Sequence, residues 1–249
     1  MRILESGPET DDPLTPYLAV DRSRPRHECW VTGHMVAGLD GTAARAGRVG
    51  AMSTDADQVL FRRMRQIADV VLVGAQTVRR EGYGPVRLAE EAQAARVLLG
   101  QQPVPPVAVV SRSLDLDWDA RVFAEADSRT YVITCSAADP ERVAAAGQVA
   151  SVVVAGEERV DPACALRALA ALGHRVVLCE GGPQWLGEMV AADRLDELLL
   201  SVSPVIGGDP LPVCVNPPGA ELRRFRLGHA MVEDDALFLR YERAGGHHE

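Results

Sequence analysis

The chain has 249 residues, of which 47% are hydrophobic and 4% aromatic, and its formal net charge is -9. This length and apolar content are enough for one large α/β domain or two small ones. The scarcity of aromatic residues argues against a base-stacking nucleic-acid platform, and the negative charge disfavours DNA or an anionic membrane as the main partner. An anionic small ligand stays compatible with the sequence where arginines gather locally.

The five cysteines are widely spaced, and no pair has the CxxC spacing of a zinc or redox motif. We therefore expect buried free thiols in a reducing compartment, and no metal site. Residues 1–26 lack the apolar core of a signal peptide, and no apolar run approaches the roughly 20 residues of a membrane span. These features predict a cytoplasmic protein.

The first feature in chain order is a polar, proline-containing extension, residues 1–26, which is expected to have little regular structure. Its apolar residues are Leu14, Tyr17, Leu18 and Val20. Burying such side chains is favourable, so they can pin the extension to the body of the domain.

A strand at 30–37 follows, and then a turn and a Gly/Ala-rich loop at 42–52 that permits close backbone approach to a ligand. Ser53 or Thr54 can cap the next helix, which has acidic residues in its first turn and an apolar stripe at helical spacing. Further helices are expected at 88–99, 140–146, 162–172 and 183–192. Further strands are expected at 70–73, 107–110, 130–134, 152–155, 175–179, 195–202 and 236–241.

Strands and helices alternate, and most strands are short continuous runs of Val, Leu and Ile. This pattern is typical of strands that are buried on both faces of a sheet. No repeat or linker divides the sequence. We therefore predict an α/β fold with a central, mostly parallel sheet flanked by helices, in a single domain over residues 27–243 with a short tail at 244–249.

An acidic residue and two glycines, Glu180, Gly181 and Gly182, follow the predicted strand 175–179, and Pro183 opens the next helix. N–H groups at a helix N-terminus are unpaired and partly positive, and glycine lets the backbone approach a phosphate closely. Proline suits the first helical position because its missing N–H costs nothing there. The motif predicts an anion-binding site with an acid beside it that can face a substrate. The alternative is an ordinary turn with one glycine in the left-handed conformation.

Three other strand ends also carry small or polar groups: Ala37, residues 74–77 and residues 111–113. Ligands gather at the carboxyl ends of strands in open α/β sheets, so we expect these ends and Glu180 to converge on one site. The Ser-Arg-Ser of 111–113 suits a phosphate monoester, or else forms a polar turn. Residues 74–77 can donate to a pyrophosphate, or simply cap a helix. The GxGxxG and GxxxxGK[ST] fingerprints are both absent.

Several segments occur together in the order of a known family. They are residues 36–41 (VAGLDG), 68–78 (ADVVLVGAQTV), 180–183 (EGGP), 195–198 (LDEL) and 203–208 (SPVIGG). As a set they resemble the reductase domain of the bacterial riboflavin-biosynthesis deaminase–reductase, a pyrimidine reductase with the dihydrofolate-reductase fold. The resemblance runs from about Trp30 to Tyr241, and the His/Cys zinc signature of a deaminase is absent from the sequence. The chain therefore looks like a stand-alone, divergent reductase.

The resemblance implies NADPH as the cofactor and hydride transfer to a pyrimidine-type substrate of riboflavin biosynthesis, similar to 5-amino-6-(5-phosphoribosylamino)uracil. It implies catalytic roles for Glu180 and Glu81, and substrate contacts for Arg65, Glu180 and Arg87. Taken alone, Arg65 is as readily a solvated arginine. The cofactor-binding residues that the resemblance implies are Ala37, Gly50, Thr77, Ser111, Arg112, Ser113, Gly181, Gly182, Pro183, Gln184, Trp185 and Leu186. Of these, residues 111–113 match the stretch that binds the adenosine 2′-phosphate, which favours NADPH over NADH.

The sequence departs from the family pattern mainly on the substrate side. Gly38 stands where the family has serine, and Glu81 to Arg87 replace its Asp-x-Pro-x-Leu-Thr-x-Arg segment. These departures keep two alternatives open: dihydrofolate reductase-like activity on a pterin, and a regulatory protein that binds NADP without catalysis. The resemblance also implies a homodimer, and neither nucleic acid nor membrane is expected as a partner.

Overall fold

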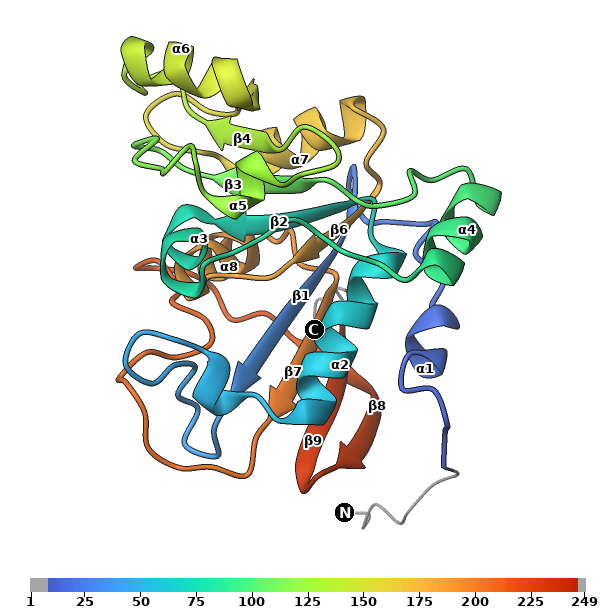
Figure 1. Ribbon diagram of the computed structural model, residues 1–249. Helices are drawn as coiled ribbons and strands as arrows, with labels where there is room; N and C mark the ends of the chain where they lie inside the picture. Colours follow the sequence, from blue (N-terminus) through green and yellow to red (C-terminus); the bar gives the residue numbers. More distant parts are fainter. Residues whose placement is uncertain (1–8, 246–249) are drawn as a thin grey trace.

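The computed structural model describes residues 9–245, which are built around one nine-stranded sheet of order β5-β4-β3-β2-β6-β1-β7-β9-β8 (Figure 1). Neighbouring strands from β5 to β7 are parallel, whereas β9 runs antiparallel to β7 and β8 antiparallel to β9. The predicted α/β fold with a mostly parallel sheet is confirmed. The strands are β1 (Trp30–Ala37), β2 (Val70–Gly74), β3 (Val107–Val110), β4 (Tyr131–Thr134), β5 (Ser151–Val154), β6 (Val176–Cys179), β7 (Glu197–Val202), β8 (Phe225–Glu233) and β9 (Ala236–Arg243).

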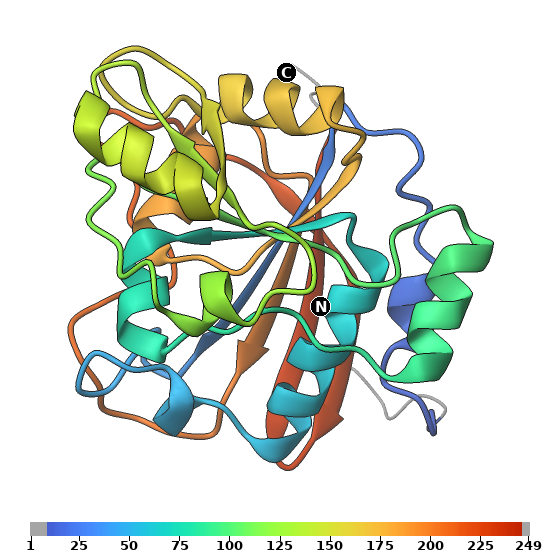
Figure 2. The ribbon, with the colours of Figure 1, turned by 45° about the horizontal axis from the view of Figure 1, so that its top comes forward.

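Helices cover both faces of the sheet (Figure 2). One core contains α2, α3 and α5 side chains, and the other contains Leu166 and Leu169 of α7 with Leu186 and Met189 of α8. Successive residues of β2 divide between the two cores, as side chains of a strand must. The helices are α1 (Thr15–Leu18), α2 (Asp55–Met64), α3 (Ala75–Glu81), α4 (Glu90–Leu98), α5 (Arg121–Ala124), α6 (Pro140–Val149), α7 (Pro162–Ala171) and α8 (Pro183–Ala191), with short 3-10 turns at Gly50–Met52 and Arg65–Ile67.

Local chemistry explains the element boundaries that the sequence predicted well. The Thr54 side chain accepts the N–H of Asp57 and so caps α2, as expected. Leu60 and Met64 of this helix are buried at helical spacing. The strands β1 and β3 begin and end at the predicted residues.

Several elements differ from the sequence prediction, among them the short helices α1 and α5, which were not expected. Strand β8 was not expected, because its side chains are mostly exposed and it forms the edge of the sheet, so it has no continuous apolar run. Asp234 and Asp235, both at positive φ, form the turn that joins β8 to β9. Residues 79–87 were expected to be a polar, Gly-rich segment, but α3 extends to Glu81 and ends at Gly82 in the left-handed conformation.

The described part of the N-terminal extension packs into the body of the domain. Leu14 and Tyr17 belong to the main core and are 0% and 1% exposed, whereas Leu18 lies at the surface. Farther along, Arg22 donates from Nε and Nη2 to the buried carboxylate of Glu197, each at 3.0 Å. Residues 1–8 of the predicted extension and 246–249 of the predicted tail lie outside the described residues.

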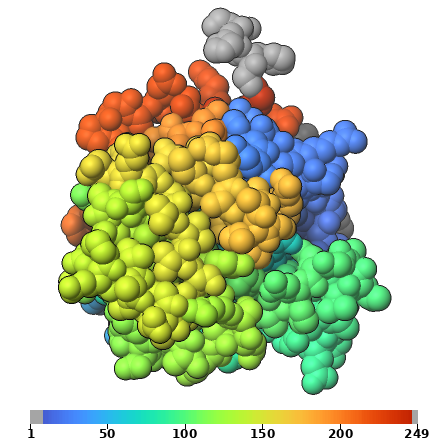
Figure 3. All heavy atoms as spheres, turned by 90° about the horizontal axis from the view of Figure 1, so that it is seen from above, coloured from blue at the N-terminus to red at the C-terminus, as the bar shows by residue number. Residues whose placement is uncertain are grey.

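Seen from above, α6 and α7 cover one end of the molecule and α4 projects at its side (Figure 3). Helix α4 carries exposed apolar residues at its end, Val97 and Leu98, followed by Leu99. No helix within residues 9–245 has both the length and the apolar character needed to cross a lipid bilayer.

Candidate active site

Four consecutive strands of the sheet, β3, β2, β6 and β1, end on the same side. Of the segments that the sequence predicted to converge there, residues 74–77 and 180–183 contribute to one cavity, whereas residues 111–113 after β3 do not line it. A cavity of about 600 Å³ opens at the ends of β1, β2 and β6, and helices α2, α3 and α8 complete its wall. A cavity of this size matches the clefts that hold small ligands and cofactors.

A buried ion pair lies at one end of this cavity. Arg65 donates from Nε to Oε1 of Glu180 at 2.8 Å and from Nη2 to Oε2 at 2.7 Å. The side chains of Arg65 and Glu180 are 14% and 0% exposed. A fork of two parallel bonds fixes the orientation of both groups. The arginine is therefore a buried partner of Glu180 and not a solvated side chain.

Tyr83 completes this cluster. Its hydroxyl donates to Oε2 of Glu180 and accepts from Nη2 of Arg65 at 3.0 Å. Burial and the adjacent Glu180 charge raise the pKa of Tyr83 well above its ordinary value, so the phenol keeps its proton. Burial opposes the charge on Arg65, but the charge of Glu180 and the hydrogen bonds to Glu180 and Tyr83 together outweigh it, so the pKa of the guanidinium is raised. Arg65 also lies over the ring of Phe61, with 4.8 Å from Cζ to the centroid.

Gly181 and Gly182 follow Glu180, and Gly182 lines the cavity. The Gly74 N–H donates to the Gly181 carbonyl at 2.8 Å, and Gly181 has a φ of +87° that suits glycine. A Cβ on Gly182 would lie only 2.9 Å from Oγ1 of Thr77. The peptide bond between the two glycines is cis. A side chain on Gly182 would crowd Thr77 and one on Gly181 would crowd Met35, so the glycines keep the backbone accessible.

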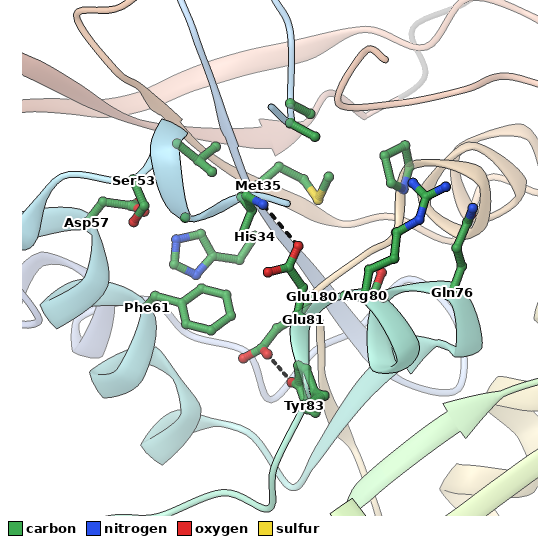
Figure 4. A pocket seen from close by; sticks show the side chains of 18 of the residues that line it. His34, Met35, Ser53, Asp57, Phe61, Gln76, Arg80, Glu81, Tyr83 and Glu180 are labelled. Atoms are coloured by element: carbon green, nitrogen blue, oxygen red, sulfur yellow. Dashed lines mark hydrogen bonds between the residues drawn. The ribbon is translucent and has the colours of Figure 1, made fainter. Parts of the chain in front are cut away.

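Helix α8 begins at this wall, with Gly182 as its N-cap and Pro183 as its first residue, and no side chain caps it. Its first N–H groups therefore remain available to an anion. Gly182, Pro183 and Gln184 line the cavity. In Figure 4, Gln76 and Arg80 of α3 lie on the side of the cavity opposite Ser53 and Asp57.

Glu81 holds the Gly/Ala-rich loop against the end of α3 by a hydrogen bond. Its Oε1 accepts the N–H of Val49 at 2.9 Å. This bond ties the end of α3 to the Gly/Ala-rich loop, and Gly47, Val49 and Gly50 of that loop line the cavity. The acid therefore has a positioning contact in addition to its place at the cavity wall.

Two buried polar residues at the cavity were missed by the sequence analysis. His34 lies on β1 and is 3% exposed, and Asp57 lies in the first turn of α2 and is 4% exposed. Both stand beside Phe61 in Figure 4. The signal in the sequence was a polar residue on an apolar pattern: His34 interrupts the run of β1, and Asp57 lies on the same helical face as Leu60 and Met64. Tyr83 was named only as part of a segment that departs from the family pattern.

The cavity brings together many, but not all, of the predicted site residues. Those that line it are Gly50, Arg65, Thr77, Glu81, Glu180, Gly182, Pro183 and Gln184. Those that do not are Ala37, Arg87, Ser111, Arg112, Ser113, Gly181, Trp185 and Leu186, although Ala37 and Gly181 directly adjoin lining residues.

Residues 111–113 and Arg87 lie outside the cavity for identifiable reasons. The Ser111 hydroxyl is buried and accepts the N–H of Leu114 at 3.0 Å, which stabilises the turn after β3. Arg112 lies at the surface of this turn. Arg87 is engaged elsewhere, since it donates to the Asp127 carboxylate at 2.5 Å and to the Glu125 carbonyl at 2.7 Å. Among residues 9–245, no three His, Cys, Asp or Glu side chains are grouped as metal ligands.

Comparison with known proteins assigns the chain to a family. The chain matches the RibD C-terminal domain family over residues 29–234. It is 29% identical, over 188 residues, to the 2,5-diamino-6-ribosylamino-4(3H)-pyrimidinone 5′-phosphate reductase of Archaeoglobus fulgidus, and the match covers 74% of this chain and 85% of the relative.

Solved structures agree with this match. A pyrimidine reductase-like protein of Corynebacterium diphtheriae has 25% identity and a TM-score of 0.77, with 95% of this chain and 96% of that chain covered. The deaminase/5-amino-6-(5-phosphoribosylamino)uracil reductase of Thermotoga maritima has 23% identity and a TM-score of 0.64, with 87% and 57% covered, and shows the shared fold. The α/β architecture with a mostly parallel sheet is shared with these solved structures. The chain belongs to the RibD C-terminal domain family of pyrimidine reductases.

Proposed function

We propose that this protein is an NADPH-dependent reductase that transfers hydride to a phosphoribosylaminopyrimidine, a step of riboflavin biosynthesis. One observation carries the proposal: the uncapped N-terminus of α8 and the buried Arg65–Glu180–Tyr83 cluster line a single cavity. A phosphorylated cofactor and a polar heterocycle can therefore lie side by side in it. The family membership and the name of the archaeal relative support this reading.

The residues of the α8 wall fit a dinucleotide. The open backbone at Gly182, the hydroxyl of Thr77 and the N-terminus of α8 would hold the pyrophosphate. When bound, NADPH supplies the hydride. Arg112 is exposed on the turn after β3, the neighbour of β2, and is proposed to bind the 2′-phosphate.

The residues of the Arg65–Glu180–Tyr83 cluster and their neighbours would bind and orient the substrate. Arg65 holds Glu180 in one orientation, so this carboxylate presents a fixed acceptor surface next to the cavity. Phe61 offers an aromatic face to a flat ring. Glu81 keeps the loop at Val49 in place and so helps to exclude water from the reacting carbon. Catalytic roles for Glu180 and Glu81 remain part of the proposal.

The test is NADPH oxidation, followed at 340 nm, by the purified protein with 2,5-diamino-6-ribosylamino-4(3H)-pyrimidinone 5′-phosphate, with its uracil counterpart and with dihydrofolate. Turnover with either pyrimidine supports the proposal. Turnover with dihydrofolate alone would favour the pterin alternative. NADPH binding without any turnover would favour a regulatory protein.

A homodimer is also proposed, on the family resemblance. Strand β7 is paired on both edges, with β1 and with β9, so it offers no free edge to a second subunit. Light scattering that reports a monomer at working concentration would reject the dimer.

A further inference from the structure

Helix α2 and the turn after it supply one wall of the cavity. Asp57 and Phe61 of the helix and Arg65 of the turn all line the cavity. They follow one another at intervals of four residues, so they share one side of the helix. A displacement of α2 would therefore move all three groups together.

Few polar contacts hold α2 in place. Its buried residues Leu60 and Met64 belong to the main core. Among the described residues, the side chains of 55–64 form hydrogen bonds to a single segment outside the helix and its cap, namely the N-terminal extension. The Arg63 guanidinium donates to both carboxylate oxygens of Asp12, from Nη1 at 2.6 Å and from Nη2 at 2.9 Å. The position of α2 therefore depends on the core and on this one ion pair.

Asp12 is itself fixed at the start of α1. Its Oδ1 accepts the N–H of Leu14 at 2.9 Å, and its carbonyl accepts the N–H of Thr15 at 3.1 Å. Leu14 and Tyr17 are almost completely buried in the same core as the apolar side of α2. The carboxylate that binds Arg63 is thus part of an ordered, packed segment.

The other end of this segment is anchored to the sheet. Arg22 donates two bonds to Glu197 of β7, and its Nη1 donates to the Tyr17 carbonyl at 2.7 Å. Residues 12–22, here called the N-terminal strap, therefore connect β7 to α2, and α1 lies beside α2 in Figures 1 and 2. The strap precedes residues 29–234, which match the family.

The strap contacts α2 on the side turned away from the cavity. Arg63 follows Phe61 by two residues, which is a rotation of about 200° around the helix axis. Phe61 lines the cavity and Arg63 does not. Asp12 can therefore act on a bound ligand through the position of α2, and not by touching the ligand.

We propose that Asp12 is a positioning residue for the substrate side of the cavity, because through Arg63 the N-terminal strap fixes α2 and with it Asp57, Phe61 and Arg65. The inference rests on the proposed reductase function and adds to it a segment outside the family match. Within the described residues, the strap forms no hydrogen bond to α8, the helix proposed to hold the pyrophosphate. Loss of the ion pair should therefore weaken substrate binding and leave NADPH binding unchanged.

The kinetic experiment compares the wild type with Asp12→Ser, in which serine can still accept the N–H of Leu14 but is too short to reach Arg63. We expect the KM for the phosphoribosylaminopyrimidine to rise by about 2–5-fold, with kcat and the Kd for NADPH unchanged, because the pair is partly exposed, at 40% and 39%. A general loss of stability would lower the active fraction and would not change KM.

Three further variants make this test specific to the Asp12–Arg63 pair. Arg63→Met should reproduce Asp12→Ser, and the double variant should be no worse than either single one. Arg63→Lys keeps the charge and should stay close to the wild-type KM. Glu221→Ser is the control, since Glu221 pairs with Arg223 at 2.8 Å in the loop before β8. An unchanged KM in Asp12→Ser, or an equal rise in KM and in the Kd for NADPH, would overturn the proposal.

Hydrogen–deuterium exchange tests the strap without turnover. In Asp12→Ser, the amides of α2 should exchange about 2–5-fold faster than in the wild type, whereas those of α8 should keep their rates. Glu221→Ser should leave both helices unchanged. Unaltered exchange in α2, or faster exchange in both helices, would show that the strap does not hold α2. If no pyrimidine turns over, the reductase assignment fails, and the exchange rates alone decide whether Asp12 positions this helix.

Discussion

Arg65 and Glu180 are 115 residues apart in the sequence and form a two-pronged ion pair, with N–O distances of 2.8 Å and 2.7 Å, at the wall of the candidate-site cavity. The Glu180 side chain is 0% exposed, so this pairing is what permits a charged carboxylate at that place. Tyr83, from a third segment, donates to the same carboxylate. The fold thus assembles one polar cluster from a helix end, a loop and a strand end.

Removing Arg65 should destabilise the folded protein, because Glu180 is buried and loses its ion-pair partner. Arg65→Ala leaves Glu180 with only its Tyr83 bond, and we expect the free energy of unfolding to fall by about 3 kcal/mol. Urea denaturation measures this loss. Arg226→Ala is the control, because the Arg226 side chain is 72% exposed and should change stability by less than about 0.5 kcal/mol. An Arg65→Ala protein as stable as the control would show that the pair does not hold the site together.

Alkaline pH should weaken the Tyr83 contact in a defined direction. The folded-state pKa of Tyr83 is raised above the ordinary 10.0, so its contribution to stability is complete below pH 10 and is lost as pH rises above it towards the folded-state value. At pH 8, Tyr83→Phe should be less stable than wild type by about 1–2 kcal/mol, since a bond to a charged group is removed. Urea midpoints of the two proteins should converge between pH 10 and pH 11. A constant difference over that range would contradict the assignment.

The N-terminal segment should contribute to stability through Arg22. Arg22 donates two bonds to Glu197, and Arg240 donates to the same carboxylate. We expect Arg22→Ala to lower the free energy of unfolding by about 2–3 kcal/mol, because Glu197 is fully buried and keeps only part of its compensation.

The same network predicts an acid-sensitive stability. Burial acts to raise the pKa of Glu197, but Arg22 and Arg240 hold it below its ordinary 4.5. Its contribution is therefore present above pH 4.5 and is lost as pH falls through the folded-state pKa. Glu197→Gln should show a smaller loss of stability between pH 5 and pH 3 than wild type in the same denaturation assay. Identical acid profiles would argue against a charged network.

Gly182 should be intolerant of a side chain. In Gly182→Ala, the new Cβ would lie 2.9 Å from Oγ1 of Thr77, so either the Thr77 side chain or the start of α8 must shift. We expect the Kd for NADPH to rise at least about tenfold, since close backbone approach to a phosphate is lost. Isothermal titration calorimetry measures this Kd. Gly147→Ala is the matched control, because a Cβ there meets no atom within 4 Å and the substitution in α6 should leave NADPH binding unchanged.

Arg112 tests the choice between the two nicotinamide cofactors. Arg112→Ala should weaken NADPH binding by about 10-fold or more while NADH binding changes little, because only NADPH carries the 2′-phosphate. The same titration with both cofactors measures the difference. Equal losses for the two cofactors would rule out the proposed contact.

Much of the fold was determined by the sequence alone. The continuous apolar runs of β2 and β3, the Thr54 cap of α2 and the proline that opens α8 are local signals, and each element formed where its signal lies. The convergence of strand ends followed from the rule that parallel strands end at a common edge. Strand β8 was not predicted from the sequence. It is an exposed edge strand that pairs with one neighbour and carries no continuous apolar run.

For the candidate site, too, one part was predictable from the sequence and another part depended on tertiary contacts. The sequence by itself located the glycine-rich wall, since Glu180, Gly181 and Gly182 are adjacent and stand between a strand and a helix. Only the tertiary structure decided what Glu180 binds, because Arg65 and Tyr83 reach it through contacts 115 and 97 residues long in sequence. It also decided that His34 and Asp57 face one cavity. The physical reason is that burial and hydrogen-bond pairing depend on which chain segments pack together, and no single segment encodes that by itself.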